Sequence, residues 1–204
     1  MVIYIGEFSK YIIALLIVLY TLECFAVFRY DNEDHRSGIY IRQNLLMFAF
    51  HFVCFLVICF ETEDMTYLFF YAFQQIVLYA AVVLYRMLYP KANRLIVNNM
   101  CMLLGISFVI LTRLDMGKAV KQFVIVTGSL TVALIIPFFV HKFKFLKNLK
   151  WVYALVGIAA LSIVMILGQT TYGSKLSYSI AGITFQPSEF VKILFVFFVA
   201  SALY

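Results

Sequence analysis

The sequence predicts an all-α fold, a polytopic transmembrane helix bundle. Of the 204 residues, 65% are hydrophobic and only 13% are charged, whereas a soluble domain is about half apolar and about a quarter charged. The mean hydropathy is +0.98. Several apolar stretches reach the roughly 17–25 residues that a helix needs to cross a bilayer about 30 Å thick. These stretches are continuous and lack the alternating pattern of barrel strands.

About seven spans are expected, separated by polar connections. The charged segment 29–36 ends the first span, and the acidic residues 61–64 end the second. Pro137 falls late in the fifth span and predicts a kink or a terminus there. Residues 168–186, rich in Gly, Ser, Thr and Tyr, are expected to form a loop before a last helix that begins at Pro187. The expected spans before it are residues 5–28, 41–60, 67–85, 96–112, 123–140 and 151–167.

The basic residues predict the orientation of the chain. The net charge of +6 is spread among the connections, which the positive-inside rule explains better than nucleic-acid binding. The first, third and fifth connections carry most of it, as Arg29, Arg36, Arg42, Arg86, Lys91, Arg94, Lys142, Lys144, Lys147 and Lys150. These connections are expected to be cytoplasmic, so the N-terminus and the loop before Pro187 should lie outside. The short fourth connection, residues 113–122, is also basic and goes against the rule.

The last helix brings an acid and a base into an apolar stretch. Pro187 suits the first position of a helix, and Glu189 and Lys192, three residues apart, share a face. A charge in the hydrocarbon core costs about 2.5–3.5 kcal/mol on insertion scales, which favours a functional or helix-packing role. The alternative is a first-turn acid stabilised by the helix dipole together with a lysine that reaches back to the interface.

These residues also carry a family resemblance. The segment Phe185-Gln186-Pro187-Ser188-Glu189-Phe190-Val191-Lys192 resembles the signature at the fourth core helix of the SEDS family, which includes FtsW, RodA and SpoVE. Upstream, Gly173-Ser174-Lys175 and Gly182 resemble elements of the preceding loop, and Arg113-Leu114-Asp115 with Ala119 and Gln122 resembles the segment after the first core helix. The resemblance covers about residues 98–204.

The resemblance implies a peptidoglycan glycosyltransferase that polymerises lipid II at the outer face of the bacterial cytoplasmic membrane, in division or elongation. It implies a class B penicillin-binding transpeptidase as partner. Glu189 and Lys192 would line the lipid II cavity, with Glu189 orienting Lys192 or a divalent cation. The other implied site positions are Gln186 and Ser188 in the cavity, Phe185 and Pro187 at the helix start, Gly173 and Lys175 in the loop, and Arg113 and Asp115 as further candidates.

The same resemblance divides the chain into residues 1–95, about three additional helices, and residues 96–204, the first four of about ten core helices. The family's proposed catalytic Asp lies in a later loop, and no residue here matches it. The chain is therefore expected to be the N-terminal part of a longer protein and inactive alone. A flippase for lipid-linked precursors and a non-enzymatic membrane scaffold are the alternatives.

Other polar residues within the apolar stretches are expected to form hydrogen bonds between helices. They are Glu7, Glu23, His51, Gln74 and Gln75. The four cysteines show neither a CxxC motif nor pairing with histidine, and reduced thiols are expected. They are Cys24, Cys54, Cys59 and Cys101.

Overall fold

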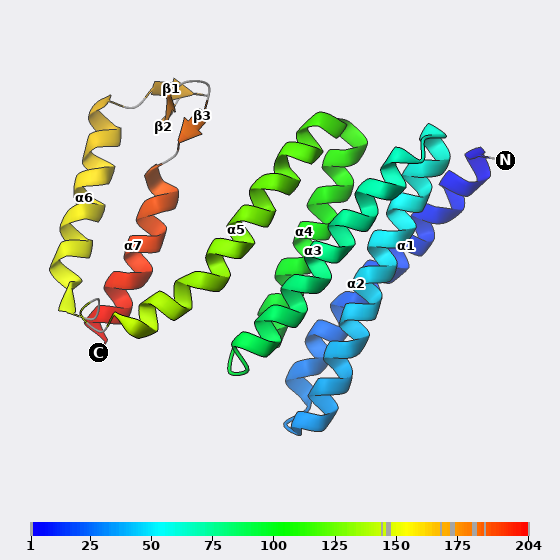
Figure 1. Cartoon of the computed structure of the whole chain (residues 1–204), viewed down its shortest axis with the longest axis horizontal. Coiled ribbons are helices and arrows are strands. Elements are labelled where there is room, and N and C mark those ends of the chain that lie inside the picture. The colour runs from blue at the N-terminus through cyan, green and yellow to red at the C-terminus, as the bar shows by residue number, and fades with distance from the viewer. Residues whose placement is uncertain are drawn as a thin grey trace. The chain divides into compact units, whose positions relative to one another are not determined.

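The computed structural model describes residues 2–143, 145, 148–167, 169–171, 174–180, 183–185 and 187–203. The chain forms two compact units, Met1–Leu134 and Ile135–Tyr204. Helices dominate both units (Figure 1). The predicted all-α membrane fold is confirmed: five helices in the described part of the chain are long and apolar enough to cross a membrane. The total of seven spans and the outward N-terminus stay predictions.

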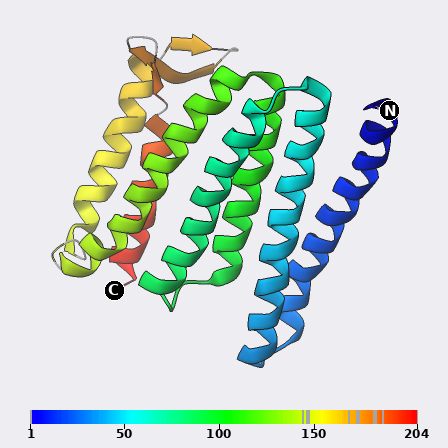
Figure 2. The same ribbon diagram turned by 45° about the vertical axis from the view of Figure 1, so that its right-hand side comes forward.

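The first unit is an up-and-down array of helices (Figure 2). Its elements are α1 (Val2–Ala26), the 3-10 turn η1 (Val27–Arg29), α2 (Glu33–Thr62), α3 (Thr66–Leu88), α4 (Arg94–Leu114) and most of α5 (Met116–Lys142). The connections after α1 and α3 lie at one end of this unit, and the connections after α2 and α4 lie at the other. The basic first and third connections therefore share one end, whereas the acidic residues 61–64 lie at the opposite end together with the basic fourth connection, which goes against the positive-inside rule.

Several helices extend beyond the apolar spans that the sequence predicts. Helix α2 begins eight residues before the predicted span, because Asn32 caps it by accepting a hydrogen bond from the Asp34 N–H at 2.9 Å. Asn93 caps α4 in the same way through the Leu95 N–H at 3.0 Å. Helix α5 continues past Pro137 to Lys142, so that proline is not a terminus. Hydropathy locates the hydrocarbon-spanning part of a helix, whereas capping groups decide where the helix begins.

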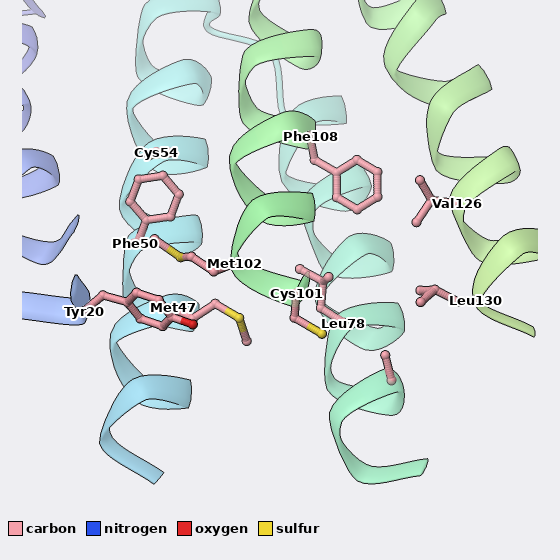
Figure 3. Close-up of a cluster of buried hydrophobic side chains, with 11 residues drawn as sticks. Tyr20, Met47, Phe50, Cys54, Leu78, Cys101, Met102, Phe108, Val126 and Leu130 are labelled. Atoms are coloured by element: carbon pink, nitrogen blue, oxygen red, sulfur yellow. The ribbon is translucent and has the colours of Figure 1, made fainter. Parts of the chain in front are cut away.

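The apolar core of the first unit is centred on α4 (Figure 3). Phe108 and Cys101 of α4 are fully buried, and Leu78 of α3 and Met47 of α2 pack in the same cluster. Helices α1 and α5 contribute to it as well. The remaining buried members of the cluster are Tyr20, Phe50, Cys54, Ala81, Met102, Val126 and Leu130. One core thus joins α4 and α5 to the three helices that precede them.

Polar side chains connect α1, α2 and α4 inside this unit. The Arg42 guanidinium donates to both carboxylate oxygens of Glu23, at 2.7 and 3.0 Å. The neighbouring Gln43 amide donates to the Glu23 carbonyl at 3.2 Å and accepts from Asn98 at 2.9 Å. Gln43 and Asn98 are both buried. The expected hydrogen bonding between helices is confirmed for Glu23, and buried amides strengthen it because hydrocarbon offers no alternative partner.

A second polar cluster joins α2 to α3. The fully buried His51 ring lies between two glutamines, with Nδ1 3.1 Å from the Gln75 Oε1 and Nε2 3.1 Å from the Gln74 Oε1. The Phe55 ring packs edge-on against the imidazole, with centroids 4.9 Å apart. His51 therefore fits the predicted interhelical hydrogen bonding.

The second unit pairs two helices and carries a small sheet. Helices α6 (Lys150–Leu167) and α7 (Pro187–Ala202) pack together, and β1 (Gln169–Thr171), β2 (Ser174–Ile180) and β3 (Ile183–Phe185) form an antiparallel sheet in the order β1-β2-β3. Thr170 pairs with Lys175, and Phe185 pairs with Tyr178. The connection that the sequence predicts as a loop is therefore largely a sheet, and its last strand leads toward α7.

We expect Asn98→Leu to lower the free energy of unfolding by about 1–2 kcal/mol, because it leaves the buried Gln43 oxygen without a donor. The double variant Gln43→Leu/Asn98→Leu should lose less free energy of unfolding than the two single variants lose in sum. The measurement is equilibrium unfolding in mixed micelles. The control is Ile96→Ala, because Ile96 lies on the same helix and is 66% exposed. It should change stability less than Asn98→Leu. Additive effects of the two polar substitutions would contradict the proposed coupling.

Candidate functional site

The signature residues of the last helix form an exposed ion pair in its first turn. Helix α7 begins at Pro187, whose missing N–H costs no intrahelical hydrogen bond at that position. The Lys192 Nζ donates to the Glu189 Oε1 at 2.7 Å. The side chains remain 62% exposed for Glu189 and 70% exposed for Lys192. Both charges are thus held together and remain accessible to a further ligand.

The ion pair lies on the face of α7 opposite α6. Val191, Leu194 and Phe198 of α7 line an apolar groove of about 300 Å³ shared with α6. At 3.6 residues per turn, Glu189 and Lys192 point to the other side of the helix. Packing against α6 therefore leaves the charged face of α7 free.

Close packing between α6 and α7 fixes the orientation of this face. The Tyr153 and Phe197 rings lie with centroids 5.7 Å apart. Gly157 of α6 faces Val191, and a Cβ built on the glycine would meet the valine methyl at 3.8 Å. This ordinary contact distance leaves room for little beyond a methyl group at position 157. A larger side chain there would push α7 away or rotate it.

The remaining predicted site positions of the second unit lie near the start of α7 or outside the described residues. Ser188 is half-buried beside Glu189. Phe185 ends β3, and Lys175 lies on β2, a strand that contacts both α6 and α7. The predicted positions Gln186 and Gly173 lie outside the residues that the structure describes.

The described residues of this site offer a single carboxylate to a divalent cation, so the remaining oxygen ligands would have to come from a bound substrate or from water. Glu189 is the only carboxylate in the described part of α7, and an ammonium group already occupies one of its oxygens. A divalent cation in proteins takes several oxygen ligands. The described residues also contain no group of three or more His, Cys, Asp or Glu side chains that could hold a metal ion.

Arg113 and Asp115 lie in the first unit, at the turn between α4 and α5. Asp115 forms an ion pair with Lys118 at 3.3 Å and not with its neighbour Arg113. Arg113 instead reaches Glu61 at the end of α2, at 3.8 Å. The sequence contains Glu61 in its acidic connection, but its pairing with Arg113 depends on how α2 and α4 pack.

Asp115 serves as the N-terminal cap of α5. Its Oδ1 accepts a hydrogen bond from the Lys118 N–H at 3.0 Å. A Cβ on Gly117 would lie only 3.2 Å from this oxygen, so the glycine gives the carboxylate room. The hydrogen bond from the Lys118 N–H, followed by that from the Lys118 side chain, lowers the pKa of Asp115. The spacing of an acid three residues before the capped N–H is a signal that the sequence already contains.

We expect Asp115→Ala to speed hydrogen exchange at the first amides of α5, because the Lys118 N–H loses its acceptor. The folded-state pKa of Asp115 lies below its ordinary value of 3.8. Its stabilising contribution is therefore complete above about pH 4 and is lost as the pH falls through the lowered pKa. Hydrogen exchange with mass spectrometry measures this effect.

Two further variants are the controls for this cap. Lys118→Gln removes only the ion pair and should leave the exchange nearly unchanged. Asp115→Asn keeps an acceptor and should remove the acid dependence. Equal exchange in Asp115→Ala and the unchanged protein would show that Asp115 is not the cap.

Comparison with known proteins places this turn and the α7 ion pair in one family segment. No curated protein and no solved structure matches the chain. Residues 93–204 match the FtsW/RodA/SpoVE family, described as cell cycle proteins. The match begins directly before α4, whereas the first compact unit extends to Leu134; the division into residues 1–95 and 96–204 stays a prediction. Because more than half of the sequence is matched, this multi-pass membrane protein belongs to the FtsW/RodA/SpoVE, or SEDS, family of cell-wall biogenesis.

Proposed function

We propose that the chain is the N-terminal part of a peptidoglycan glycosyltransferase that polymerises lipid II. The family membership supports this reaction class. The observation that carries the proposal is the accessible Glu189–Lys192 ion pair, on a helix face that α6 leaves free. We place the protein in the cytoplasmic membrane of a bacterium, where a class B penicillin-binding protein and the division or elongation machinery are its expected partners.

Lys192 is suited to bind the pyrophosphate of a lipid-linked sugar. Its ammonium has three N–H donors, and one of them is used by Glu189. The others remain for phosphate oxygens, which lysine binds as a point charge. The first turn of a helix also offers free backbone N–H groups and a positive dipole end to an anion. The predicted site therefore combines two independent sources of attraction for a pyrophosphate.

Glu189 orients the lysine in this proposal. A free lysine side chain has several rotamers, and the carboxylate one turn away selects the geometry seen at 2.7 Å. Ile193 and Val196 extend the same face of α7 and are 55% and 66% exposed. Such a surface suits the polyprenyl chain that follows the pyrophosphate in lipid II. Along this face of α7 the charged pair is thus followed by apolar residues, just as the pyrophosphate of lipid II is followed by its polyprenyl chain.

Both residues are proposed as substrate-binding groups and not as catalytic ones. No residue of this sequence matches the family's proposed catalytic Asp, so proton abstraction is assigned to the part of the family fold that follows these helices. Ser188 and the residues at the start of α7 would complete the binding site. Transport of the same lipid-linked precursor would use the same charges, and the experiment below separates the two activities.

We expect Glu189→Ala and Lys192→Ala, each introduced into the full-length protein, to abolish glycan polymerisation from labelled lipid II while leaving membrane insertion intact. Stability should hardly change, because an exposed pair three residues apart contributes only about 0.2–0.5 kcal/mol. Lys142→Ala removes an exposed lysine from α5 and is the charge-matched control. It should keep normal polymerisation.

The reversed pair Glu189→Lys/Lys192→Glu distinguishes substrate binding from a structural role. A merely structural ion pair would be restored by the exchange, whereas a pyrophosphate site would remain inactive because the charges change places. Recovery of polymerisation in the reversed variant would overturn the site assignment. In liposomes, translocation of labelled lipid II without polymer would favour the flippase alternative. Normal glycan synthesis by both alanine variants would also contradict the proposal.

A further inference from the structure

A small pocket in the first unit is lined by both apolar and polar side chains. It is formed by the start of α2, the end of α3 and the start of α4, and its volume is about 50 Å³. One water needs about 10–15 Å³ by this kind of measure, so the pocket has room for a phosphate-sized group. These helix ends lie at the end of the unit where the connections after α1 and α3 are found (Figure 1). That end carries the basic first and third connections.

Two arginines line this pocket without a carboxylate partner. Arg86 comes from the last turn of α3 and Arg94 from the first residue of α4. Neither forms an ion pair within the described residues, and no acidic residue is found among the described lining residues. Arg36 and Arg42, at the same end, each pair with a carboxylate. Arg94 also begins a helix, where the dipole disfavours a cation. An anion in the pocket would pair with both arginines and would also offset the unfavourable interaction of Arg94 with the helix dipole.

Neutral polar groups in the pocket require that its ligand also supply a hydrogen-bond donor. The Asn44 Oδ1 is buried and has no hydrogen-bond partner, although a buried acceptor is normally satisfied. Ser37 lines the same pocket and is half-buried. An oxygen acceptor cannot bind phosphate oxygens directly, so its missing partner must be a donor. A ligand that carries both a phosphate and a hydroxyl group would satisfy the arginines and the asparagine together.

The position of the pocket points to a lipid as the source of this phosphate. Ile41 and Val82 line it beside the polar groups, and Ile41 is 54% exposed on a membrane-spanning helix. Met87 and Leu88, directly after Arg86, are also exposed. Basic pockets between helices at a membrane interface are suited to acidic lipid headgroups. Apolar surface beside the arginines provides a place for the acyl chains.

We propose that Arg86, Arg94 and Asn44 form a binding site for the headgroup of an anionic phospholipid, a phosphodiester that carries a hydroxyl group. The arginines hold the phosphate, and the Asn44 oxygen accepts from the headgroup hydroxyl. The site lies mainly on helices that precede the family segment, and it is independent of the polymerase proposal. A soluble glycerol phosphate offers the same chemistry and is therefore included in the test.

The test uses the full chain, purified in detergent and titrated with single lipids by native mass spectrometry and thermal unfolding. We expect phosphatidylglycerol to bind and raise the melting temperature, and phosphatidylcholine to bind weakly. Arg86→Gln/Arg94→Gln should weaken phosphatidylglycerol binding by about fivefold for each arginine. Arg29→Gln removes one arginine charge at the same end of the unit, as each single pocket substitution does, from an exposed residue outside the pocket. It should change binding less than twofold.

Asn44→Leu tests the hydroxyl contact by itself. It should weaken phosphatidylglycerol binding and leave the binding of phosphatidylmethanol, which has the same charge and no headgroup hydroxyl, unchanged. The melting temperature of each variant is first measured without lipid. If the glutamine double variant fails to fold, Arg86→Lys/Arg94→Lys replaces it and keeps both charges. Equal binding of phosphatidylcholine, or equal losses in Arg29→Gln and the double variant, would overturn the proposal. Stabilisation by glycerol phosphate or inorganic phosphate at the same concentration would overturn the lipid assignment.

Discussion

The first unit depends on the rule that a polar group buried between membrane helices must find its partner on another helix. Helix α4 meets this rule twice. Asn98 donates to Gln43 of α2 at 2.9 Å, and the neighbouring Asn99 accepts from the Tyr20 hydroxyl of α1 at 2.9 Å. Any rotation or sliding of α4 would break both bonds, and the apolar core around Phe108 and Cys101 would lose its packing with them.

This constraint ties helices α1 to α3, which precede the family match, to the matched segment. The match begins at residue 93, yet α4 is packed among α1, α2 and α3 and shares one core with them. In lipid there is little hydrophobic force between helices, so close packing and polar pairing supply the specificity. Helices α1 to α3 therefore share one packed core with the beginning of the matched segment. The family match and the packing of the chain divide it at different points, since sequence likeness does not record such contacts.

The two charged sites differ in what their surroundings supply. Glu189 satisfies Lys192 directly, and both stay exposed on a helix face that α6 leaves open. Arg86 and Arg94 have no carboxylate among the described residues that line their pocket, and a buried Asn44 oxygen lies there without a donor. The first arrangement suits a substrate that enters and leaves, because a partner remains when the ligand departs. The second suits a ligand that stays, because its absence leaves polar groups unsatisfied.

By itself the sequence determined the membrane-helix fold, the charge of each connection, the family and the Glu189–Lys192 pairing. These follow from hydropathy, from loop charge and from the local geometry of one helix turn, all of which are short-range in the chain. Tertiary structure alone decided that Arg113 meets Glu61, that β2 contacts α6 and α7, and that Arg86, Arg94 and Asn44 share one pocket. These depend on the rotation of one helix against another, which side-chain packing sets.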